Sequence, residues 1–494
     1  MSASELIYTA ILLPALASLL IWAAGRRPNL REGVTLATAV TLAVVVFNLL
    51  PAVLAGGRPA TDATEVLPGL EIAFTVEPLG MLFALVASIL WIVNSIYSIG
   101  YMRGNNEPRQ TLFYICFAVA ISATMMVAFS ANLFTLFIGY EVLTLSTYPL
   151  VTHKGTDEAR RAGRVYLLLL LTTSMVLLLP AIIAVGYISG TLNFVPGGIL
   201  QGTLPPLLMG GLLALFIFGI GKAAVMPVHF WLPAAMVAPT PVSALLHAVA
   251  VVKAGVFTVV KVIVYIFGVE ALRESGAGDW LVYVAGFTVI TASIVALRQD
   301  NLKKRLAYST ISQLSYVVLA ASILTPAAIV GAAMHIAAHA VSKITLFFAA
   351  GSVYTAAHVT EISHMDGIGR RMPWTMGAFA VGALSMIGLP PTAGFLGKWF
   401  MLEGAVSSAQ WVPLAVIVIS TMLNAAYFLP IIHRAFLRPA PVHADAHHGD
   451  GHHEHGEAPW PIVLALTLTA AGTIALFLFP GIPLSLAEQL AGMN

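Results

Sequence analysis

Apolar runs, each long enough to cross a bilayer, follow one another along almost the whole chain. The 494 residues are 59% hydrophobic and only 9% charged, whereas soluble globular proteins carry about 25% charged residues. A transmembrane helix needs about 20 consecutive, mainly apolar residues. Since lipid satisfies no backbone polar group, an apolar chain of this kind crosses the membrane as helices or as a closed barrel. Runs of this length predict an all-α polytopic membrane protein.

The breaks between the apolar runs predict about fourteen transmembrane helices, numbered in chain order as spans 1 to 14. Their expected ranges are 5–24, 33–55, 75–100, 111–130, 132–152, 162–188, 205–234, 241–268, 279–297, 305–323, 326–356, 374–402, 410–433 and 459–481. The boundary between spans 4 and 5 rests on the polar residues Ser130 and Asn132, because no charged residue separates the two runs.

The distribution of basic residues predicts the orientation. Of 24 Lys and Arg residues, seventeen fall in odd-numbered loops, while only Arg58 and Arg273 fall in even-numbered ones. Basic residues concentrate on the cytoplasmic side of membrane proteins. This bias predicts a multi-pass protein of the bacterial inner membrane with both termini outside, in the periplasm. The pair Arg26–Arg27 follows the first apolar run instead of preceding it, so we expect that run to be a retained span, not a cleaved signal peptide.

Several classes of function find no support in the sequence. The single cysteine, Cys116, rules out an internal disulfide and argues against a cysteine-ligated iron–sulfur cluster held by this chain alone. There is no dinucleotide-binding or phosphate-binding glycine motif. The formal net charge of +2 comes with no basic cluster typical of nucleic-acid binding. We therefore expect no cofactor, no resident metal and no nucleic-acid partner.

The stretch 219–255 combines membrane hydrophobicity with charge. It contains Lys222 and Lys253 and is interrupted by four prolines, of which Pro227 is the first. A charged side chain at bilayer depth costs about 2.5–3.5 kcal/mol even on the most lenient scale, so an intramembrane lysine indicates function. Interrupted backbone is tolerated there only where protein or a water-filled cavity covers it. The stretch predicts a polar path through the membrane.

A second interruption lies in span 12. Its sequence GLPPTAGFLGKWF contains Pro390 and Pro391 ahead of Lys398. Broken helices at corresponding places in two halves indicate inverted repeats around a site near the membrane midplane. We predict two inverted five-helix repeats, spans 4–8 and spans 9–13, with spans 7 and 12 broken.

The corresponding division of the chain has five parts. These are an N-terminal part (1–110), repeat one (111–268), repeat two (279–435), a His-rich cytoplasmic loop (436–458), and the last span with the C-terminus (459–494). Histidine tracts such as 443–455 can bind metals. A solvated loop without bound metal is the favoured interpretation, and metal binding stays open.

Glu141 is the only ionisable residue at mid-depth in span 5. A lone buried carboxylate is costly unless it is paired or protonated, and Lys222 is its expected partner. Moving that partner away would change the proton affinity of the lysine. A static structural ion pair is the alternative. Lys253 lies mid-way along span 8, whereas Lys261, near the outer end, is interpreted as an interface anchor.

Span 11 carries His335, His339 and Lys343 at spacings of four residues, which place them along one helix face with steps of about 40°. Histidine titrates near neutral pH and can accept and donate a proton at once, which suits a relay. The spacing is a poor metal site, because a lysine would repel the ion. The polar residues Ser309, Thr310, Ser312 and Gln313 of span 10 could line this path, but helix packing is the favoured interpretation of them.

The ionisable side chains in these spans form one candidate set, called the relay residues: Glu141, Lys222, Lys253, His335, His339, Lys343 and Lys398. The set contains no nucleophile–base pair and no metal cage. Proton movement fits its chemistry better than bond breaking, so we expect an ion-transport protein and not an enzyme.

Four segments carry a resemblance to a known family: GKAAVMPVHFWLPAAMVAPTPVSALLHAVAVVKAG, NLKKRLAYSTISQLSY, HIAAHAVSKITLFFAAG and GLPPTAGFLGKWF. In this order they resemble the antiporter-like proton-translocating subunits shared by respiratory complex I, membrane-bound hydrogenases and Mrp-type cation/proton antiporters. The likeness covers nearly the whole chain. Chain length and the setting of Lys398 are most similar to the D-type subunit of the Mrp antiporters.

The resemblance implies a fourteen-helix fold with two inverted repeats, a Glu141–Lys222 pair, and later stations at Lys253, at the polar positions of span 11, and at Lys398. It implies a proton-conducting subunit of a multi-subunit Na⁺/H⁺ antiporter, with H⁺ and Na⁺ as its ions and a second antiporter-like subunit among its membrane partners. Two alternatives stay open: a proton-pumping subunit of a redox-driven complex, and a structural subunit without an ion path.

Overall fold

The computed structural model describes residues 1–439 and 456–493, and the described chain is almost entirely helical. Twelve helices in these ranges are long and apolar enough to cross a membrane. The two predicted spans missing from that set are spans 7 and 12, where shorter apolar helices, Pro206–Gly219 and Pro373–Ile387, stand instead. The polytopic, all-helical prediction is confirmed, and the two short helices fall where the sequence predicts broken spans.

The helices that precede the first break are α1 (Ala3–Ala23), α2 (Pro28–Leu54), α3 (Pro78–Gly104), α4 (Gln110–Ala128), α5 (Leu133–Val151), α6 (Asp157–Thr173), η1 (Ser174–Leu178) and α7 (Leu179–Ser189). Those from the first break to span 8 are α8 (Pro206–Gly219), η2 (Gly221–Ala223), α9 (Trp231–Ala234), η3 (Ala235–Val237), α10 (Thr240–Ala244), η4 (Leu245–Val249), α11 (Val251–Val262) and η5 (Ile263–Phe267).

The helices of the second half are α12 (Val269–Ser275), α13 (Asp279–Leu297), α14 (Leu302–Ile323), α15 (Pro326–Ala357), η6 (Ile362–His364), α16 (Ile368–Arg371), α17 (Pro373–Ile387), α18 (Ala393–Ser407), α19 (Trp411–Leu437), α20 (Trp460–Leu478) and α21 (Gly481–Leu490). A small antiparallel hairpin, β1 (Thr64–Leu67) and β2 (Leu70–Ile72), pairs Thr64 with Ile72. This hairpin is not among the elements expected from the sequence.

The boundary between spans 4 and 5 is made by a helix cap. α4 ends at Ala128, and the side chain of Asn132 accepts a hydrogen bond from the backbone N–H of Thr135 at 2.7 Å, at the start of α5. Asparagine is a preferred residue at this position because its side chain satisfies an N–H that the helix leaves unpaired. The predicted split is therefore confirmed without any charged residue.

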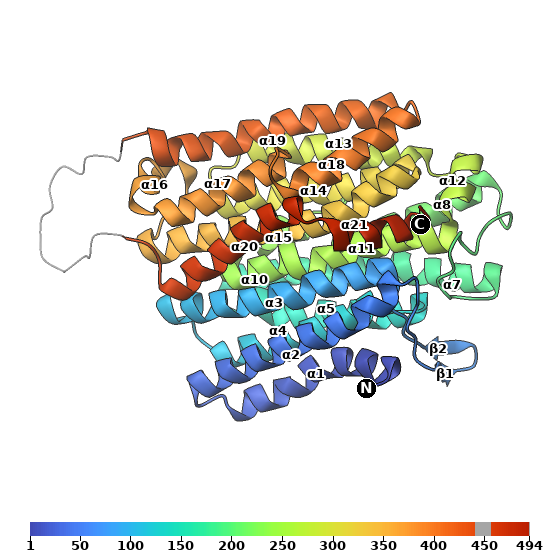
Figure 1. The fold of residues 1–494 in the computed structure, drawn as a ribbon, viewed down its shortest axis with the longest axis horizontal. Helices are drawn as coiled ribbons and strands as arrows, with labels where there is room; N and C mark the ends of the chain where they lie inside the picture. The colour runs from blue at the N-terminus through green and yellow to red at the C-terminus, as the bar shows by residue number, and fades with distance from the viewer. Residues whose placement is uncertain (440–455, 494) are drawn as a thin grey trace, which may run out of the picture.

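The long helices lie side by side along the long axis of the molecule, with α1 at one edge and α19 at the other (Figure 1). α15 is the centre of this arrangement, since it packs against α3, α11, α14, α17, α18 and α20. The segment 240–267 is buried along its whole length, and α15 is buried along nearly all of it. The polar residues of both elements therefore lie in the protein interior and not toward lipid.

The outer helices expose large apolar side chains, among them Leu19 and Trp22 of α1, Met422 of α19 and Trp460 of α20. Such surfaces are suited to lipid or to other membrane helices. The inverted repeats and the five-part division of the chain stay predictions. The His-rich tract 443–455 lies outside the described residues.

Candidate functional site

The first break lies in span 7, and it begins earlier than predicted. α8 ends at Gly219, so Lys222 lies in the short helix η2 within the break, not ahead of it, and Pro227 comes later. A Cβ on Gly219 would lie 2.5 Å from the backbone nitrogen of Leu178. Close packing of backbone against backbone sets this break. Pro227, which has no N–H to donate, falls in the turn that follows.

Lys222 is fully buried and is held by the adjacent helix α5. Its Nζ donates to the carbonyl oxygen of Tyr140 at 2.8 Å and to the hydroxyl of Thr144 at 2.5 Å, and it lies 3.1 Å from the centre of the Tyr140 ring. A cation over an aromatic face is stabilised by the negative potential of the ring. α5 therefore surrounds the ammonium with oxygen and aromatic groups.

Glu141 lies on the same helix, but the structure does not pair it directly with Lys222. Within residues 1–439 and 456–493, no ion pair involves Glu141, and both of its carboxylate oxygens are buried without a hydrogen-bond partner. The predicted contact is absent because Lys222 is already occupied by Tyr140 and Thr144. The carboxylate is next to the lysine site without a partner of its own.

The second break lies between α17 and α18 and contains Pro390 and Pro391, as predicted. Gly388 has φ +92°, and a Cβ there would lie 2.7 Å from Cδ of Lys398, so this glycine makes room for the lysine stem. Nζ of Lys398 donates to the carbonyls of Met386 at 3.2 Å and Ile387 at 2.8 Å, and to the Thr421 hydroxyl at 3.2 Å. The carbonyls that the break leaves unpaired thus bind the ammonium.

The middle of the structure joins spans 8 and 11. Nζ of Lys253, on α11, forms a hydrogen bond with Nδ1 of His339, on α15. One turn further along α15, Nζ of Lys343 donates to the Ser309 hydroxyl at 2.6 Å. All three ionisable side chains are buried. Lys253 of span 8 and the polar face of span 11 therefore lie together in the structure.

His335 extends this cluster toward the second break. Its Nε2–H donates to Oε1 of Gln313 at 2.9 Å, and the amide of Gln313 donates to the Met386 carbonyl at 3.2 Å, the oxygen that also accepts from Lys398. The rings of His335 and His339 have centroids 6.1 Å apart. A nearly continuous polar series therefore runs from Lys253 to Lys398.

Two residues of span 10 differ from their sequence interpretation. Ser309 and Gln313 are not only helix-packing groups, since they bind Lys343 and His335 directly. Ser309 and Gln313 are four residues apart and so lie on one face of span 10, and this is the signal that could have identified them. His247 is also buried, and neither of its ring nitrogens has a partner among the described residues.

Lys261 differs most from its sequence interpretation. It is not an interface anchor: its side chain is fully buried, and Nζ lies 2.5 Å from Oε1 of Glu77 and 2.7 Å from the carbonyl oxygen of Ser130. Glu77 immediately precedes α3, which is far from Lys261 in the sequence. Residues from the loops at this end of the bundle cover the lysine, so its side chain does not reach the protein surface.

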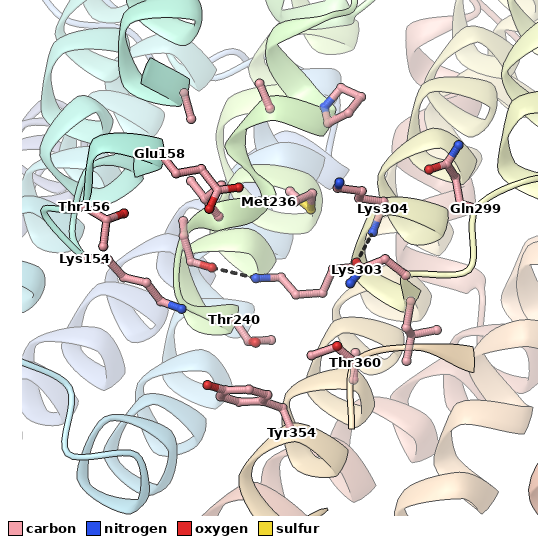
Figure 2. Close-up of a pocket in the computed structure, with 18 of the residues that line it drawn as sticks. Lys154, Thr156, Glu158, Met236, Thr240, Gln299, Lys303, Lys304, Tyr354 and Thr360 are labelled. Carbon is pink, nitrogen blue, oxygen red and sulfur yellow. Dashed lines mark hydrogen bonds between the residues drawn. The ribbon is translucent and has the colours of Figure 1, made fainter. Parts of the chain in front are cut away.

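A pocket of about 880 Å³ opens at the ends of the helices on the side predicted to face the cytoplasm. Lys154 and Lys303 reach into it from opposite walls (Figure 2), and Arg161, Lys304 and Glu158 also line it. Nζ of Lys303 donates to the Ala238 carbonyl at 2.6 Å, just ahead of α10. The pocket is lined by several basic side chains and lies where the buried segment 240–267 starts.

Beneath this pocket, in the loops, Glu107 and His153 lie 3.9 Å apart. Burial raises the pKa of Glu107, an effect that the positive charges of Lys154 and Lys303 oppose. Burial, together with the Arg109 guanidinium, lowers the pKa of His153 to about 4. The histidine is therefore neutral at physiological pH, and the contact is not an ion pair.

In the described ranges, no group of three or more His, Cys, Asp or Glu side chains is arranged to hold a metal ion. What the geometry provides is a row of buried amines, imidazoles and hydroxyls between two broken helices. This class of arrangement, a polytopic membrane protein with an interior cationic series, is suited to moving protons.

Comparison with known proteins places the chain in a family. The family model described as NADH:quinone oxidoreductase/Mrp antiporter matches residues 130–424. The chain is 34% identical over 384 residues to NADH-quinone oxidoreductase subunit N of Desulforudis audaxviator, an alignment that covers 76% of this chain and 74% of that protein. The chain belongs to the family of antiporter-like membrane subunits of NADH:quinone oxidoreductases and Mrp antiporters.

Other relatives are longer than this chain. A probable K⁺/H⁺ antiporter component of Rhizobium meliloti is 31% identical, with 82% of this chain and 41% of that protein covered. Hydrogenase-4 component B of Escherichia coli is 29% identical, with 69% and 52% covered. The chain therefore spans about half of these two proteins.

The fold also matches two solved structures. A chain in the Mrp complex from Dietzia sp. DQ12-45-1b superposes with a TM-score of 0.84 at 20% identity, covering 100% of this chain and 97% of that one. A chain in an archaeal membrane-bound sulfane sulfur reductase superposes with a TM-score of 0.85 at 23% identity, covering 99% and 98%. At these identities the likeness concerns the fold.

Proposed function

We propose that this protein is the proton-conducting subunit of a multi-subunit monovalent cation/proton antiporter, with Na⁺ as the exchanged cation. The observation that carries the proposal is the buried series Lys253–His339, Lys343, His335–Gln313 and Lys398, which runs from span 8 to the second broken helix. Buried amines and imidazoles can take up and release protons, because burial and neighbouring charges shift the balance between their charged and neutral forms.

In this proposal, protons enter through the basic pocket and reach the relay residues by way of the segment that contains His247. Glu141 controls the first half: its unpaired carboxylate is close enough to act on the charge of Lys222 without bonding to it. When a charge brought by a neighbouring subunit changes the electrostatic environment of Glu141, the proton affinity of Lys222 changes, and the change passes on to Lys253.

The partners in this proposal are other membrane subunits, including a second antiporter-like subunit, in a bacterial inner membrane with both termini periplasmic. The exposed apolar faces of α1 and α19 offer room for such subunits. Assignment to the D-type subunit of Mrp antiporters stays a prediction, because the relatives include NADH-quinone oxidoreductase, hydrogenase and K⁺/H⁺ antiporter proteins alike.

Alanine substitutions in the first half test the proposal. Lys222→Ala and Glu141→Ala should each abolish cation-driven proton exchange in membrane vesicles that contain the assembled complex. Arg273→Ala is the matched control, since Arg273 is exposed on α12 and pairs, among the described residues, only with Glu270 three residues away. Full exchange in either relay variant would refute the proposal. Loss of assembly without a separable transport defect would favour a structural subunit.

A second candidate is the same proton module within a redox-driven complex. Its support is that the relatives include NADH-quinone oxidoreductase subunits and a hydrogenase component. The native complex should be purified with its partners and examined for flavin and iron–sulfur absorbance. Absorbance from co-purifying subunits would favour the redox-driven complex, whereas a colourless complex that exchanges Na⁺ for protons would favour the antiporter.

A further inference from the structure

The relay described above makes no use of the buried pair Glu77–Lys261. This pair lies at the end of the bundle opposite the basic pocket, beneath the loops predicted to face outward. Nζ of Lys261 is 2.5 Å from Oε1 of Glu77, and the side chains of Lys261 and Glu77 are 0% and 5% exposed, respectively. A charge pair this deeply buried is rarely more stabilising than apolar side chains of the same volume. Its presence in an apolar segment therefore indicates a functional role.

The position of Lys261 connects the pair to the relay. Lys261 follows Lys253 by eight residues on the same helical segment, a rise of about 12 Å with a rotation of about 80°. Phe257 stands midway between them, and its ring centre is 5.3 Å from Nζ of Lys261. Phe257 is fully buried and packs on Phe83 of α3 with ring centroids 5.1 Å apart. Phe257 therefore lies one helical step from each lysine, four residues from Lys253 and four from Lys261.

The groups around Lys261 and Glu77 stabilise the charged forms of both side chains. The Ser130 carbonyl accepts from Nζ of Lys261 at 2.7 Å, and the Phe194 ring centre lies 4.2 Å from the same atom. Glu77 stands at the start of α3, where the positive end of the helix dipole favours a carboxylate. The other groups that face the pair are the Tyr265 hydroxyl and, from the loop after α2, Arg58.

We propose that Lys261 and Glu77 form an outer proton exit of the first half, separated from Lys253 by Phe257. This inference rests on the proposed function, because Lys253 supplies the proton. At the exit, an N–H bond of the Lys261 ammonium breaks and an O–H bond forms on Glu77. That O–H bond then breaks and releases the proton to outer water. When Phe257 moves aside, water can enter between the two lysines. An N–H bond of the Lys253 ammonium then breaks, and the proton passes along this water to the neutral amine of Lys261.

A pair of truncations in the reconstituted complex tests the exit. Phe257→Ala should raise the passive proton leak of proteoliposomes, measured as the decay of a pH gradient without Na⁺ or K⁺, several-fold. Phe216→Ala, which truncates an equally buried phenylalanine packed on Phe267, should not. Adding Lys261→Met to Phe257→Ala should return the leak to the wild-type rate. A leak that persists in the double variant, or no leak in Phe257→Ala, would overturn the proposal.

Thiol labelling provides a second measurement for the case in which Phe257→Ala does not assemble. On a Cys116→Ser background, Phe257→Cys should react slowly with a membrane-impermeant thiol reagent added from outside. The reaction should become several-fold faster when Glu77→Gln neutralises the carboxylate. Glu32→Gln is the matched control, because Glu32 also forms a buried ion pair, with Arg31, at the opposite end of the bundle. Equal labelling rates in both backgrounds would contradict the exit.

Labelling also separates this inference from the proposed function, since it needs no transport. If Lys222→Ala retained full exchange while Glu77→Gln opened access to position 257, the exit would stand and the relay would fail. If both Glu77→Gln and Lys261→Met removed the protein from the assembled complex while Glu32→Gln did not, the pair would be a structural anchor, and the exit would be refuted.

Discussion

The two broken helices hold their lysines in different ways. In the first break, the ammonium of Lys222 is bound by the neighbouring helix α5, through the Tyr140 carbonyl and the Thr144 hydroxyl. In the second, the ammonium of Lys398 is bound mainly by carbonyls of its own break, Met386 and Ile387. The first lysine therefore depends on a second element, whereas the second is held by the backbone of its own span.

The two breaks also differ in whether a carboxylate lies near the buried lysine. Glu141 lies beside the Lys222 site and is half-buried as a whole residue. Its two carboxylate oxygens are buried and have no hydrogen-bond partner among the described residues. Among the groups that bind Lys398 there is no carboxylate. If the proposed function holds, this difference makes the first half the part that responds to a neighbouring subunit, and the second half the part with a fixed lysine setting.

Alanine substitutions of one glycine at each break should differ most in their effect on stability and assembly. At Gly255, which packs on the first break, a Cβ would collide with the backbone of Lys222. At Gly388 it would meet only the flexible stem of Lys398, although φ is +92°. Gly255→Ala should therefore prevent assembly or lower Tm strongly, because rigid backbone cannot give way. Gly388→Ala should cost about 1–2 kcal/mol from its left-handed backbone.

Thermal unfolding of the purified protein, with recovery of the assembled complex, measures both effects. Gly211→Ala is the control, since nothing lies within 4 Å of a Cβ at this exposed position in α8, and alanine favours a helix over glycine by about 1 kcal/mol. A Gly255→Ala variant as stable as Gly211→Ala would show that the first break is not fixed by this close contact.

Removing one hydroxyl at each break sharpens the comparison. Thr144→Val should slow exchange at least about tenfold, because it deletes a charge-assisted hydrogen bond of 2.5 Å, worth about 1.5–3 kcal/mol. Thr421→Val should slow exchange about threefold or less, because its bond to Lys398 is 3.2 Å long and two carbonyls remain. Initial exchange rates in vesicles measure both. Equal losses would remove the distinction between the breaks.

His153, which lies away from both breaks, should make a small contribution to the pH dependence of stability. Burial lowers its pKa from the ordinary value of 6.5 to about 4, so the unfolded chain binds the proton first as pH falls. Stability should therefore decrease between pH 6.5 and pH 4 and be fully present above this window. His153→Gln should remove about 1.4 kcal/mol of this loss at pH 5.5, or about 1–2 °C in Tm.

The Tm of the unmodified protein and of the His153→Gln variant, measured at pH 7.5 and at pH 5.5, tests this prediction. The raised pKa of Glu107 acts in the opposite direction but is common to the two, so the difference between them reports His153. An unchanged pH dependence in the variant would mean that this histidine is protonated in the folded protein.

Sequence patterns predicted where the ionisable groups lie, because charges are rare in apolar spans and helical spacing fixes their faces. They predicted Lys398 beyond a proline-rich break and the line His335, His339 and Lys343. They did not predict which atoms bind each group. The Met386 carbonyl is available only because α17 stops at Ile387, and no side chain in the sequence signals a backbone acceptor.

The remaining errors have similar causes. Pro227 marks the first broken span, but the break begins at Gly219 because that backbone packs closely on η1. Lys261 resembles an interface anchor in the sequence because its partner, Glu77, belongs to a distant segment. Glu141 and Lys222 lie in neighbouring elements, yet a carbonyl and a hydroxyl of α5 took the place that the carboxylate was expected to fill.

The central claim is that protons pass between the two breaks through the contact of Lys253 with His339. His339→Leu leaves both break lysines and their partners in place. The most direct test is the exchange rate of the reconstituted complex with this single substitution. We predict a loss of at least about 100-fold, the lower range for a positioned proton-transfer group, with the complex intact. An exchange rate equal to that of the unmodified protein would contradict the claim.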